Sequence, residues 1–295
     1  MLSSNFDLAA HEKNFNTLPP QIPLHLNTAL NLSSLFTEHL ICISLTLATD
    51  PQAAAGRMAQ NRVDRGACIY NPSTLCIYDA YVLGFNMSFV WRCATGAILL
   101  PFFCENFSRR HLDMGVATGF FPSAALAQQR PTTLPAQEIT LLDLSENSLG
   151  NAKARIAADN QTTPVSIIAV HGDVLAGVPP ELKGSKFDSI SMFNLLHCIP
   201  VPQETKNKAF ELAADVLSDD GVLVGSSVLG IRYHAWWNPL GWVTMVLFNL
   251  VLGAFGNWGD EPAVFEQGLR KEFGDVKTWI VGSMFLFQAR KPRRA

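Results

Sequence analysis

The sequence predicts an α/β fold in which a mostly parallel β-sheet is covered by helices on both faces. From about residue 108 onward, short apolar runs alternate with amphipathic stretches, which is typical of parallel strands joined by helices. Near the end, residues 276–281 and 284–289 flank Gly282 and Ser283, a strand–turn–strand pattern that predicts an antiparallel last strand. The chain has 295 residues, enough for one large domain with additions.

Residues 1–107 are predicted to form an arm and a helical lid ahead of this sheet. The start of the chain is polar and punctuated by proline, which favours a loose arm. Residues 24–49 carry apolar side chains at partly helical spacing, although residues 41–47 also alternate as a strand would. Asp50 followed by Pro51 is typical of a helix N-cap and the first helical position.

Residues 108–295 contain the predicted sheet, in which five apolar segments are expected to be parallel strands. These segments are residues 111–114, 139–145, 170–174, 187–197 and 221–227. Between them, residues 145–159 and 203–217 are amphipathic with the period of a helix. Residues 78–95 form a further helix-like segment that leads into the domain.

The turn after the first strand carries a ligand-binding pattern. Asp113 lies at the end of the strand and is followed by Gly115, Ala117 and Gly119 at alternate positions, where the chain turns tightly into a helix. Small residues there let the backbone come close to a ligand, and the first helical turn offers unpaired N–H groups. Turns of this kind serve many nucleotides, so the loop alone indicates only that class of ligand.

Acids at the ends of the next two strands strengthen the nucleotide prediction. Asp143 follows the second strand, and its two carboxylate oxygens can accept both hydroxyls of a ribose at once. An N-cap for the helix that begins near Ser145 is the alternative role for Asp143. Asp173 follows the third strand in the same way, with stabilisation of a turn as its alternative.

This ordered series resembles the class I S-adenosylmethionine-dependent methyltransferases of the small-molecule type, over residues 108–290. Residues 78–85 and 89–93 are similar to the approach to the core in those enzymes. The family's middle glycine is Ala117 here, a small residue that still lets the loop pass under the methionine part of the cofactor. The resemblance implies a Rossmann-like, seven-stranded, mostly parallel sheet with an antiparallel last strand, and S-adenosylmethionine as cofactor.

The resemblance also assigns the cofactor site to particular residues. They are Asp113, Gly115, Ala117, Gly119, Asp143, Leu144, Asp173, Val174, Asn194 and Leu195. In order along the chain, these positions are expected to serve the amino group, the ribose, the adenine and the sulfonium of the cofactor.

His197 is the predicted catalytic residue. An imidazole titrates near neutrality and could remove a proton from an acceptor hydroxyl; packing beneath the cofactor is the alternative. The acceptor site is expected to be formed by Tyr78, Trp91, Arg92, Trp236, Trp237 and Trp242. For Arg92, contact with the cofactor carboxylate or a surface salt bridge are alternatives, and for the aromatic residues the alternative is core packing.

Residues 229–261 are predicted to be a cap inserted between two strands. Residues 235–258 contain no charged residue and are long enough to span a bilayer. A span there would separate strands of one sheet, so a cap over the active site is favoured. Ligands bind beyond the carboxyl ends of parallel strands, where this segment emerges. Contact with a membrane surface is the alternative.

Composition narrows the partners and the compartment. The net charge of -3 gives no basic field for nucleic acid, which is therefore not expected as a partner. Six cysteines show neither a C-x-x-C pair nor metal-ligand spacing, which predicts thiols in a reducing compartment and no metal site. The first residues lack the pattern of a signal peptide, so a cytoplasmic location is expected.

These features predict methyl transfer to an oxygen atom of an apolar, natural-product-like small molecule. Because the cofactor's sulfonium is already activated, the protein needs to orient the reactants and exclude water, without a nucleophile or a metal. One alternative is an enzyme that keeps the cofactor but catalyses a cyclisation, elimination or rearrangement. Another is a membrane-associated binding protein. The sequence carries no signal for an oligomeric state.

Overall fold

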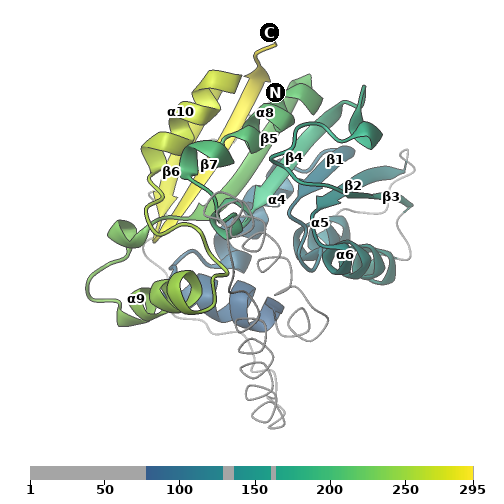
Figure 1. Ribbon diagram of the computed structural model, residues 1–295. Coiled ribbons are helices and arrows are strands. Elements are labelled where there is room, and N and C mark those ends of the chain that lie inside the picture. The colour runs from purple at the N-terminus through teal and green to yellow at the C-terminus, as the bar shows by residue number, and fades with distance from the viewer. Residues whose placement is uncertain (1–77, 129–135, 161–163, 295) are drawn as a thin grey trace, which may run out of the picture. The chain divides into compact units, whose positions relative to one another are not determined.

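The computed structural model describes residues 78–128, 136–160 and 164–294 (Figure 1). The chain divides into two compact units, Met1–Pro51 and Gln52–Ala295. The first unit lies outside the described residues, and so do the helix or strand predicted for residues 24–49 and the N-cap predicted at Asp50. Every element described below belongs to the second unit.

A seven-stranded sheet forms the centre of this unit (Figure 1). Its strands are β1 (Arg110–Met114), β2 (Gln137–Asp143), β3 (Val165–His171), β4 (Phe187–Phe193), β5 (Leu217–Val228), β6 (Phe273–Val281) and β7 (Met284–Pro292). They lie in the order β3-β2-β1-β4-β5-β7-β6. Strands β1 to β5 are parallel, and β7 runs antiparallel to both of its neighbours. The predicted Rossmann-like sheet with an antiparallel last strand is therefore confirmed.

Alternate side chains of the strands enter two apolar cores, one on each face of the sheet. In β2, for example, Leu141 packs in the first core and the next residue, Leu142, in the second. This alternation is the period-2 pattern that a strand covered on both faces requires. Helices α5 (Phe120–Gln128) and α6 (Glu146–Asp159) contribute to the first core, and α8 (Lys208–Val216) and α10 (Pro262–Glu272) to the second.

The helix predicted over residues 203–217 is interrupted. Two helices, α7 (Gln203–Lys206) and α8, meet at Asn207, and β5 begins directly after α8. The side chain of Asn207 donates from Nδ2 to the carbonyl of Val264 in α10 at 3.3 Å, which draws this junction toward the second core. Three short 3₁₀ turns occur elsewhere: η4 (Pro180–Leu182), η5 (Leu196–Cys198) and η6 (Ile231–Tyr233).

Within the described residues, three helical segments precede the first strand and share its core. They are η2 (Asp79–Val90), η3 (Thr95–Leu99) and α4 (Leu100–Glu105), of which η2 and η3 are π-helical. Phe103 is buried against Phe121 and Phe193. In the described ranges, no single helix has the length and hydropathy to cross a membrane, whereas Asp79–Val90 and Thr95–Glu105 meet that test jointly, with a bend of 88° between them.

The predicted cap lies between β5 and α10. It contains η6, α9 (Pro239–Val246) and η7 (Leu247–Val251). Asn238 caps α9, since its Oδ1 accepts from the N–H of Gly241 at 3.3 Å, with Pro239 at the first helical position. The same side chain donates from Nδ2 to the carbonyl of Val90 at 2.8 Å, which joins the cap to the end of η2.

Candidate active site

The glycine-rich turn follows β1, between the two strands β2 and β4. From β1 the chain continues to β2 and β3 on one side of the sheet, and then crosses to β4 and β5 on the other side. The turn therefore lies at the topological switch point, where open parallel sheets bind ligands. Gly115 and Gly119 have φ values of 77° and 68°, in the left-handed region that favours glycine. A Cβ on Gly115 would lie 2.6 Å from Cδ1 of Leu195, so only glycine allows this close approach to the end of β4.

Ala117 has a left-handed backbone in the same turn, with φ of 44°. This conformation costs an L-residue roughly 1–2 kcal/mol relative to the right-handed region. It is the position at which the family has its middle glycine, and the backbone there keeps the geometry that glycine would favour. The small side chain of alanine makes the substitution tolerable.

The carboxylate of Asp143 organises this turn from the neighbouring strand. Its Oδ2 accepts from the N–H of Val116 at 2.8 Å, and its Oδ1 accepts from the N–H of Ser145 at 2.8 Å. Ser145 itself caps α6, because its Oγ accepts from the N–H of Ser148. The cap at the start of α6 is therefore Ser145 and not Asp143. Burial raises the pKa of Asp143, and the N–H groups of Ser145 and Val116 oppose that rise.

Asp113 lies at the end of β1 and is buried in a chain of hydrogen bonds beneath the turn. Ser191 donates from Oγ to Oδ1 of Asp113. The same Oγ is 2.9 Å from Nε2 of His111, whose Nδ1 is 2.8 Å from Oγ of Ser189. Burial raises the pKa of Asp113 to about 7 and lowers the pKa of His111 to about 3. Around neutral pH, His111 is therefore uncharged, whereas Asp113 is present in both its protonated and its ionised form.

The ends of β2 and β3 place a second group of predicted residues at the same edge of the sheet. Asp143 is the register partner of His171, the last residue of β3. Leu144 is exposed beside it, and Val174 is buried. Oδ1 of Asp173 accepts from the N–H of Leu175 at 2.8 Å, which stabilises the turn after β3. This bond is the alternative role foreseen for Asp173; its role toward adenine stays a prediction.

Asn194 combines backbone strain with an unmatched donor at the end of β4. Its φ is 58°, its Oδ1 accepts from Oγ of Ser226 at 3.2 Å, and its buried Nδ2 has no hydrogen-bond partner. An unmatched buried donor costs about 1–3 kcal/mol, so this amide is suited to a ligand acceptor. The next residue, Leu195, packs against Gly115.

A narrow hollow of about 20 Å³ opens between these elements. It is lined by Tyr78, Leu83, Asp113, Gly115, Val116, Ala117, Thr118, Phe120, Phe121, Phe193 and Asn194. Small-ligand sites usually enclose about 300–1,000 Å³, so this hollow is smaller than the site of a nucleotide-sized cofactor. Tyr78 lines this hollow beside the cofactor loop, whereas Trp91 and Arg92 do not, and the role of Tyr78 toward an acceptor stays a prediction.

His197 lies in η5, on the side of the β4 end away from the turn. Its ring packs edge-on against Phe255 with centroids 4.6 Å apart, and near Trp91 at 6.1 Å. Nδ1 accepts from the N–H of Val228 at 3.3 Å, which places the ring proton on Nε2. Burial, and then the charge of Lys206, lower the pKa of His197 to about 3. This setting favours a neutral packing residue over a proton acceptor, and the base role stays a prediction.

The remaining residues predicted for the acceptor site lie on the outside of the cap. Trp236, Trp237 and Trp242 are 86%, 54% and 42% exposed. The guanidinium of Arg92 lies 4.6 Å from the ring centroid of Trp237, a cation–π contact, and its contact with the cofactor carboxylate stays a prediction. The structure therefore does not bring these side chains to the cofactor loop, and their role in binding an acceptor remains a prediction.

The sequence did not point to a cluster that ties η2 to the turn. Asp79, in the first turn of η2, accepts from Oγ1 of Thr118 at 2.7 Å and forms an ion pair with Arg155 of α6. The three residues are far apart along the chain, and each is of an ordinary surface type, so no local pattern marks them. In the described ranges no group of three or more His, Cys, Asp or Glu residues is placed to hold a metal ion.

Comparison with known proteins agrees with this geometry. A family model described as "Methyltransferase domain" matches residues 112–223. The O-methyltransferase NEC2 of Pyricularia oryzae is 41% identical over 261 residues, which cover 80% of this chain and 96% of that protein. The physcion biosynthesis cluster O-methyltransferase of Aspergillus chevalieri is 36% identical over 230 residues, covering 78% and 96%.

Two solved structures share the fold. A DhpI–SAH complex covers 79% of this chain and 98% of its own, with a TM-score of 0.54 at 16% identity. PigF with SAH covers 88% of this chain and 70% of its own, with a TM-score of 0.55 at 16% identity. From the relatives and the site, the chain belongs to the class I S-adenosylmethionine-dependent methyltransferases, and S-adenosylmethionine is its cofactor.

The residues present fit this cofactor. The left-handed turn at Gly115 and Ala117 leaves backbone exposed to a ligand, and the carboxylate of Asp143 retains lone pairs beyond the two it gives to backbone donors. The unmatched Nδ2 of Asn194 supplies a donor at the end of β4. When bound, the cofactor supplies an activated methyl group on its sulfonium.

Proposed function

We propose that this methyltransferase transfers the methyl group to a hydroxyl oxygen of an apolar small molecule. The observation that carries the proposal is the apolar part of the hollow, which Leu83, Phe121 and Phe193 line together with Asn194 and the cofactor turn. Apolar walls with a few fixed polar groups are typical of small-molecule sites. The O-methyltransferase names of the relatives, one of them from a biosynthesis cluster, support oxygen as the acceptor atom.

In this proposal the chain's residues bind, orient and dehydrate the reactants. Asp143 accepts hydrogen bonds from the backbone of the turn and from the ribose hydroxyls. Asn194 donates a hydrogen bond to the cofactor beside the methyl acceptor. Leu144 and Val174 enclose the adenosine. The aromatic wall excludes water from the line of approach, which supports the near in-line geometry that methyl transfer requires.

Incubation of the purified protein with S-adenosylmethionine and a panel of apolar hydroxylated compounds tests the proposal. We expect a product heavier by one methylene group, formed in step with S-adenosylhomocysteine, and no product from the matching compound whose hydroxyl is already methylated. Product formation without S-adenosylhomocysteine would instead select the non-methylating alternative.

Replacing His197 by Asn separates its two possible roles. The Oδ1 of Asn can take the place of Nδ1 and accept from Val228, so the packing role should be largely preserved, and we expect turnover within about threefold of the parent. His197→Ala should lower the melting temperature because the buried N–H loses its acceptor. A base would be lost in both variants, so a fall of about 100-fold in turnover for each would restore the catalytic assignment.

Binding of S-adenosylmethionine should strengthen as the pH rises from about 6 to about 8. Because burial raises the pKa of Asp113 to about 7, the group is mostly protonated below that pH and ionised above it. The cationic cofactor interacts better with the carboxylate, so binding releases a proton and is favoured at higher pH. Calorimetry in the parent and in Asp113→Asn checks this. The variant should bind weakly and without this pH dependence; an equal dependence in both proteins would contradict the assignment.

We also propose a cytoplasmic location. Cys93 and Cys104 carry thiols in the structure, and burial raises the pKa of Cys93 to about 12, so that group stays a protonated, unreactive thiol. Such residues suit a reducing compartment.

A further inference from the structure

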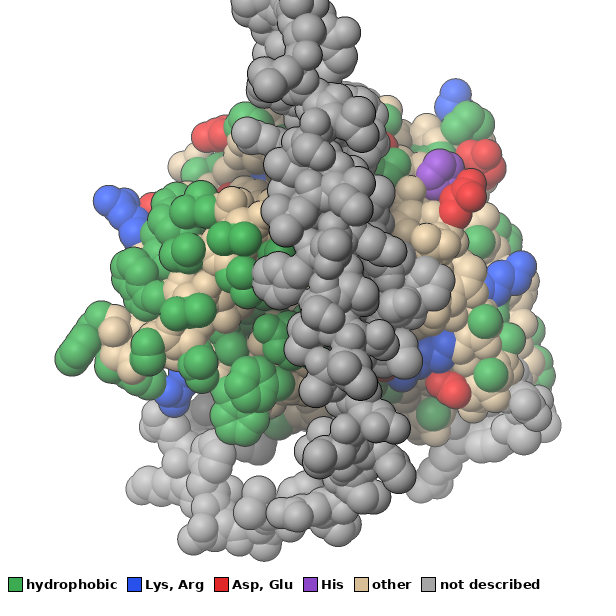
Figure 2. Space-filling model, turned by 60° about the horizontal axis from the view of Figure 1, so that its bottom comes forward, with side chains coloured by type: hydrophobic (Ala, Val, Ile, Leu, Met, Phe, Trp, Pro, Cys, Tyr) green, Lys and Arg blue, Asp and Glu red, His purple; other side chains and the backbone are tan. Residues whose placement is uncertain are grey.

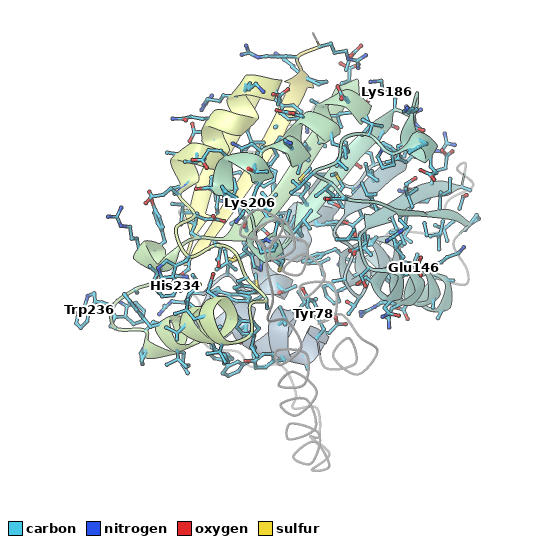
Figure 3. All side chains as sticks on the ribbon, viewed as in Figure 1. Tyr78, Glu146, Lys186, Lys206, His234 and Trp236 are labelled. Atoms are coloured by element: carbon cyan, nitrogen blue, oxygen red, sulfur yellow. The ribbon has the colours of Figure 1, made fainter. Side chains whose placement is uncertain are left out.

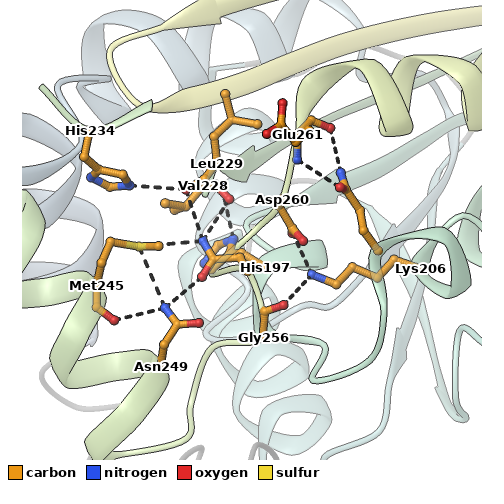
Figure 4. A network of polar contacts seen from close by, with 12 residues as sticks. His197, Lys206, Val228, Leu229, His234, Met245, Asn249, Gly256, Asp260 and Glu261 are labelled. Carbon is orange, nitrogen blue, oxygen red and sulfur yellow. Dashed lines mark hydrogen bonds and ion pairs between the residues drawn. The ribbon is translucent and has the colours of Figure 1, made fainter. Parts of the chain in front are cut away.

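The cap presents an apolar surface to solvent, with its polar side chains turned inward. Val243 of α9 and Leu250 of η7 are exposed, the latter at 68%, while Met245 is buried. Asn249 donates from Nδ2 to the carbonyl of Met245 at 3.0 Å and to Oδ1 of Asn257 at 3.1 Å (Figure 4). A helix on a water-soluble surface normally shows the opposite arrangement.

The apolar surface continues onto η2, which the cap contacts through Asn238 and Val90. Tyr81, Phe85 and Phe89 are exposed at intervals of four residues, and their rings contact one another in sequence. We name as the apolar face Tyr81, Phe85, Phe89, Trp236, Val243 and Leu250. Figure 2 shows hydrophobic side chains gathered over α9 and its neighbours, and Figure 3 shows Trp236 projecting away from the ribbon. Exposed apolar surfaces of this extent mark interaction sites.

The charges near the apolar face identify its partner. Residues 235–258 carry no charged side chain. At the border, the guanidinium of Arg92 lies over the ring of Trp237. The border acids are paired, Asp79 with Arg155 and Glu261 with Arg232 of η6. An uncharged aromatic surface with Arg92 at its edge matches the acyl boundary of a phospholipid layer and the phosphates above it.

A second feature of this surface suits an acyl chain. A shallow, open depression lies on α9 and η7, and its lining residues are all apolar: Trp242, Val243, Val246, Leu247 and Val251. Residues with an apolar body and a polar tip, such as Trp236 and Tyr81, are enriched at the membrane–water boundary.

We propose that the apolar face inserts into the headgroup–acyl boundary of a phospholipid bilayer, as a peripheral contact without a span. This reverses the preference drawn from the sequence, in which residues 235–258 cover the active site. The inference is independent of the proposed acceptor, since membrane binding can be measured with no acceptor present.

Sedimentation of the 295-residue protein with phosphatidylcholine vesicles tests the proposal. We expect binding to these zwitterionic vesicles, little changed by added salt, because burial of apolar surface supplies the free energy and the net charge is only -3. Tryptophan fluorescence should shift to shorter wavelength and be quenched by brominated lipid chains. Binding confined to acidic vesicles and abolished by salt would overturn the proposal, because it would indicate an electrostatic contact elsewhere.

Single substitutions locate the contact. Leu250→Asp and Trp236→Asp should each weaken partitioning of the protein onto vesicles by at least about tenfold. Each change removes a Leu or Trp side chain that the lipid would bury and introduces a charge. Ile168→Asp is the matched control: Ile168 is 57% exposed on β3, outside the apolar face, and its replacement should leave binding unchanged. Unchanged affinity for S-adenosylmethionine verifies that each variant is folded. Equal vesicle binding by the parent and the three variants would overturn the proposal. So would a parent protein that does not bind vesicles but forms a dimer that Leu250→Asp converts to a monomer.

Discussion

The Asp143→Ala variant is expected to bind S-adenosylmethionine about 10- to 150-fold more weakly than the parent, a loss of roughly 1.5–3 kcal/mol. The carboxylate accepts from Val116 and Ser145, so its removal unties the left-handed turn from β2 and also removes acceptors for the ribose. Calorimetric titration with the cofactor measures the change directly.

Two further variants separate the direct contact from loss of the fold. Asp143→Asn keeps one carbonyl oxygen and should show an intermediate affinity. Ser145→Ala removes the side-chain cap of α6 and should lower the unfolding free energy by about 1 kcal/mol. The backbone N–H of residue 145, which donates to Oδ1 of Asp143, stays in place. Cofactor affinity that is unchanged in Asp143→Ala, or reduced equally in Ser145→Ala, would show that the carboxylate does not hold the cofactor.

The Lys206→Met variant is expected to lose about 3–5 kcal/mol of unfolding free energy. Lys206 is fully buried, and its Nζ donates to Oδ2 of Asp260 at 2.6 Å and to the carbonyl of Gly256 at 3.0 Å (Figure 4). Burial lowers the pKa of Lys206 and raises the pKa of Asp260, and each partner offsets the effect on the other. Removal of the lysine leaves a buried carboxylate with no opposite charge.

Urea denaturation of three proteins tests this expectation. The double variant with Lys206→Met and Asp260→Leu removes both charges and should recover most of the lost stability, because apolar pairs often replace buried ion pairs without loss. Lys271→Met, in an exposed pair with Glu211, should change stability little. A Lys206→Met protein as stable as the Lys271→Met protein would contradict this expectation. It would show that Asp260 becomes protonated without a measurable loss of unfolding free energy.

Much of the sheet follows from local patterns. The strands that end near Asp113 and Asp143 could be predicted because apolar runs bounded by turns and acids leave few alternatives, and β-α-β connections have one favoured hand. The last two strands were expected because Gly282 and Ser283 lie between two short apolar runs. The interruption at Asn207 was not expected, since residues 203–217 keep the period of one helix and the break depends on a contact with α10.

The site was less predictable where roles depend on partners distant in the chain. The position of His197 suits a base or a packing residue equally, and the difference lies in the N–H of Val228 and the aromatic neighbours. The uncharged sequence of residues 235–258 does not show which side of the cap points inward. Asn238, Asn249 and Asn257 fix the inner side, and they find their partners only in the folded chain.

The left-handed backbone at Ala117 has a consequence for how relatives of this chain are recognised. A search pattern written as three glycines would pass over it, although its loop has the torsion angle that glycine favours. In this chain the position is defined by a left-handed dihedral angle beside the carboxylate of Asp143, and the residue letter is only one way to reach it. Pairing a small residue at the middle position with an acid at the end of the following strand would describe the motif more faithfully than glycine spacing.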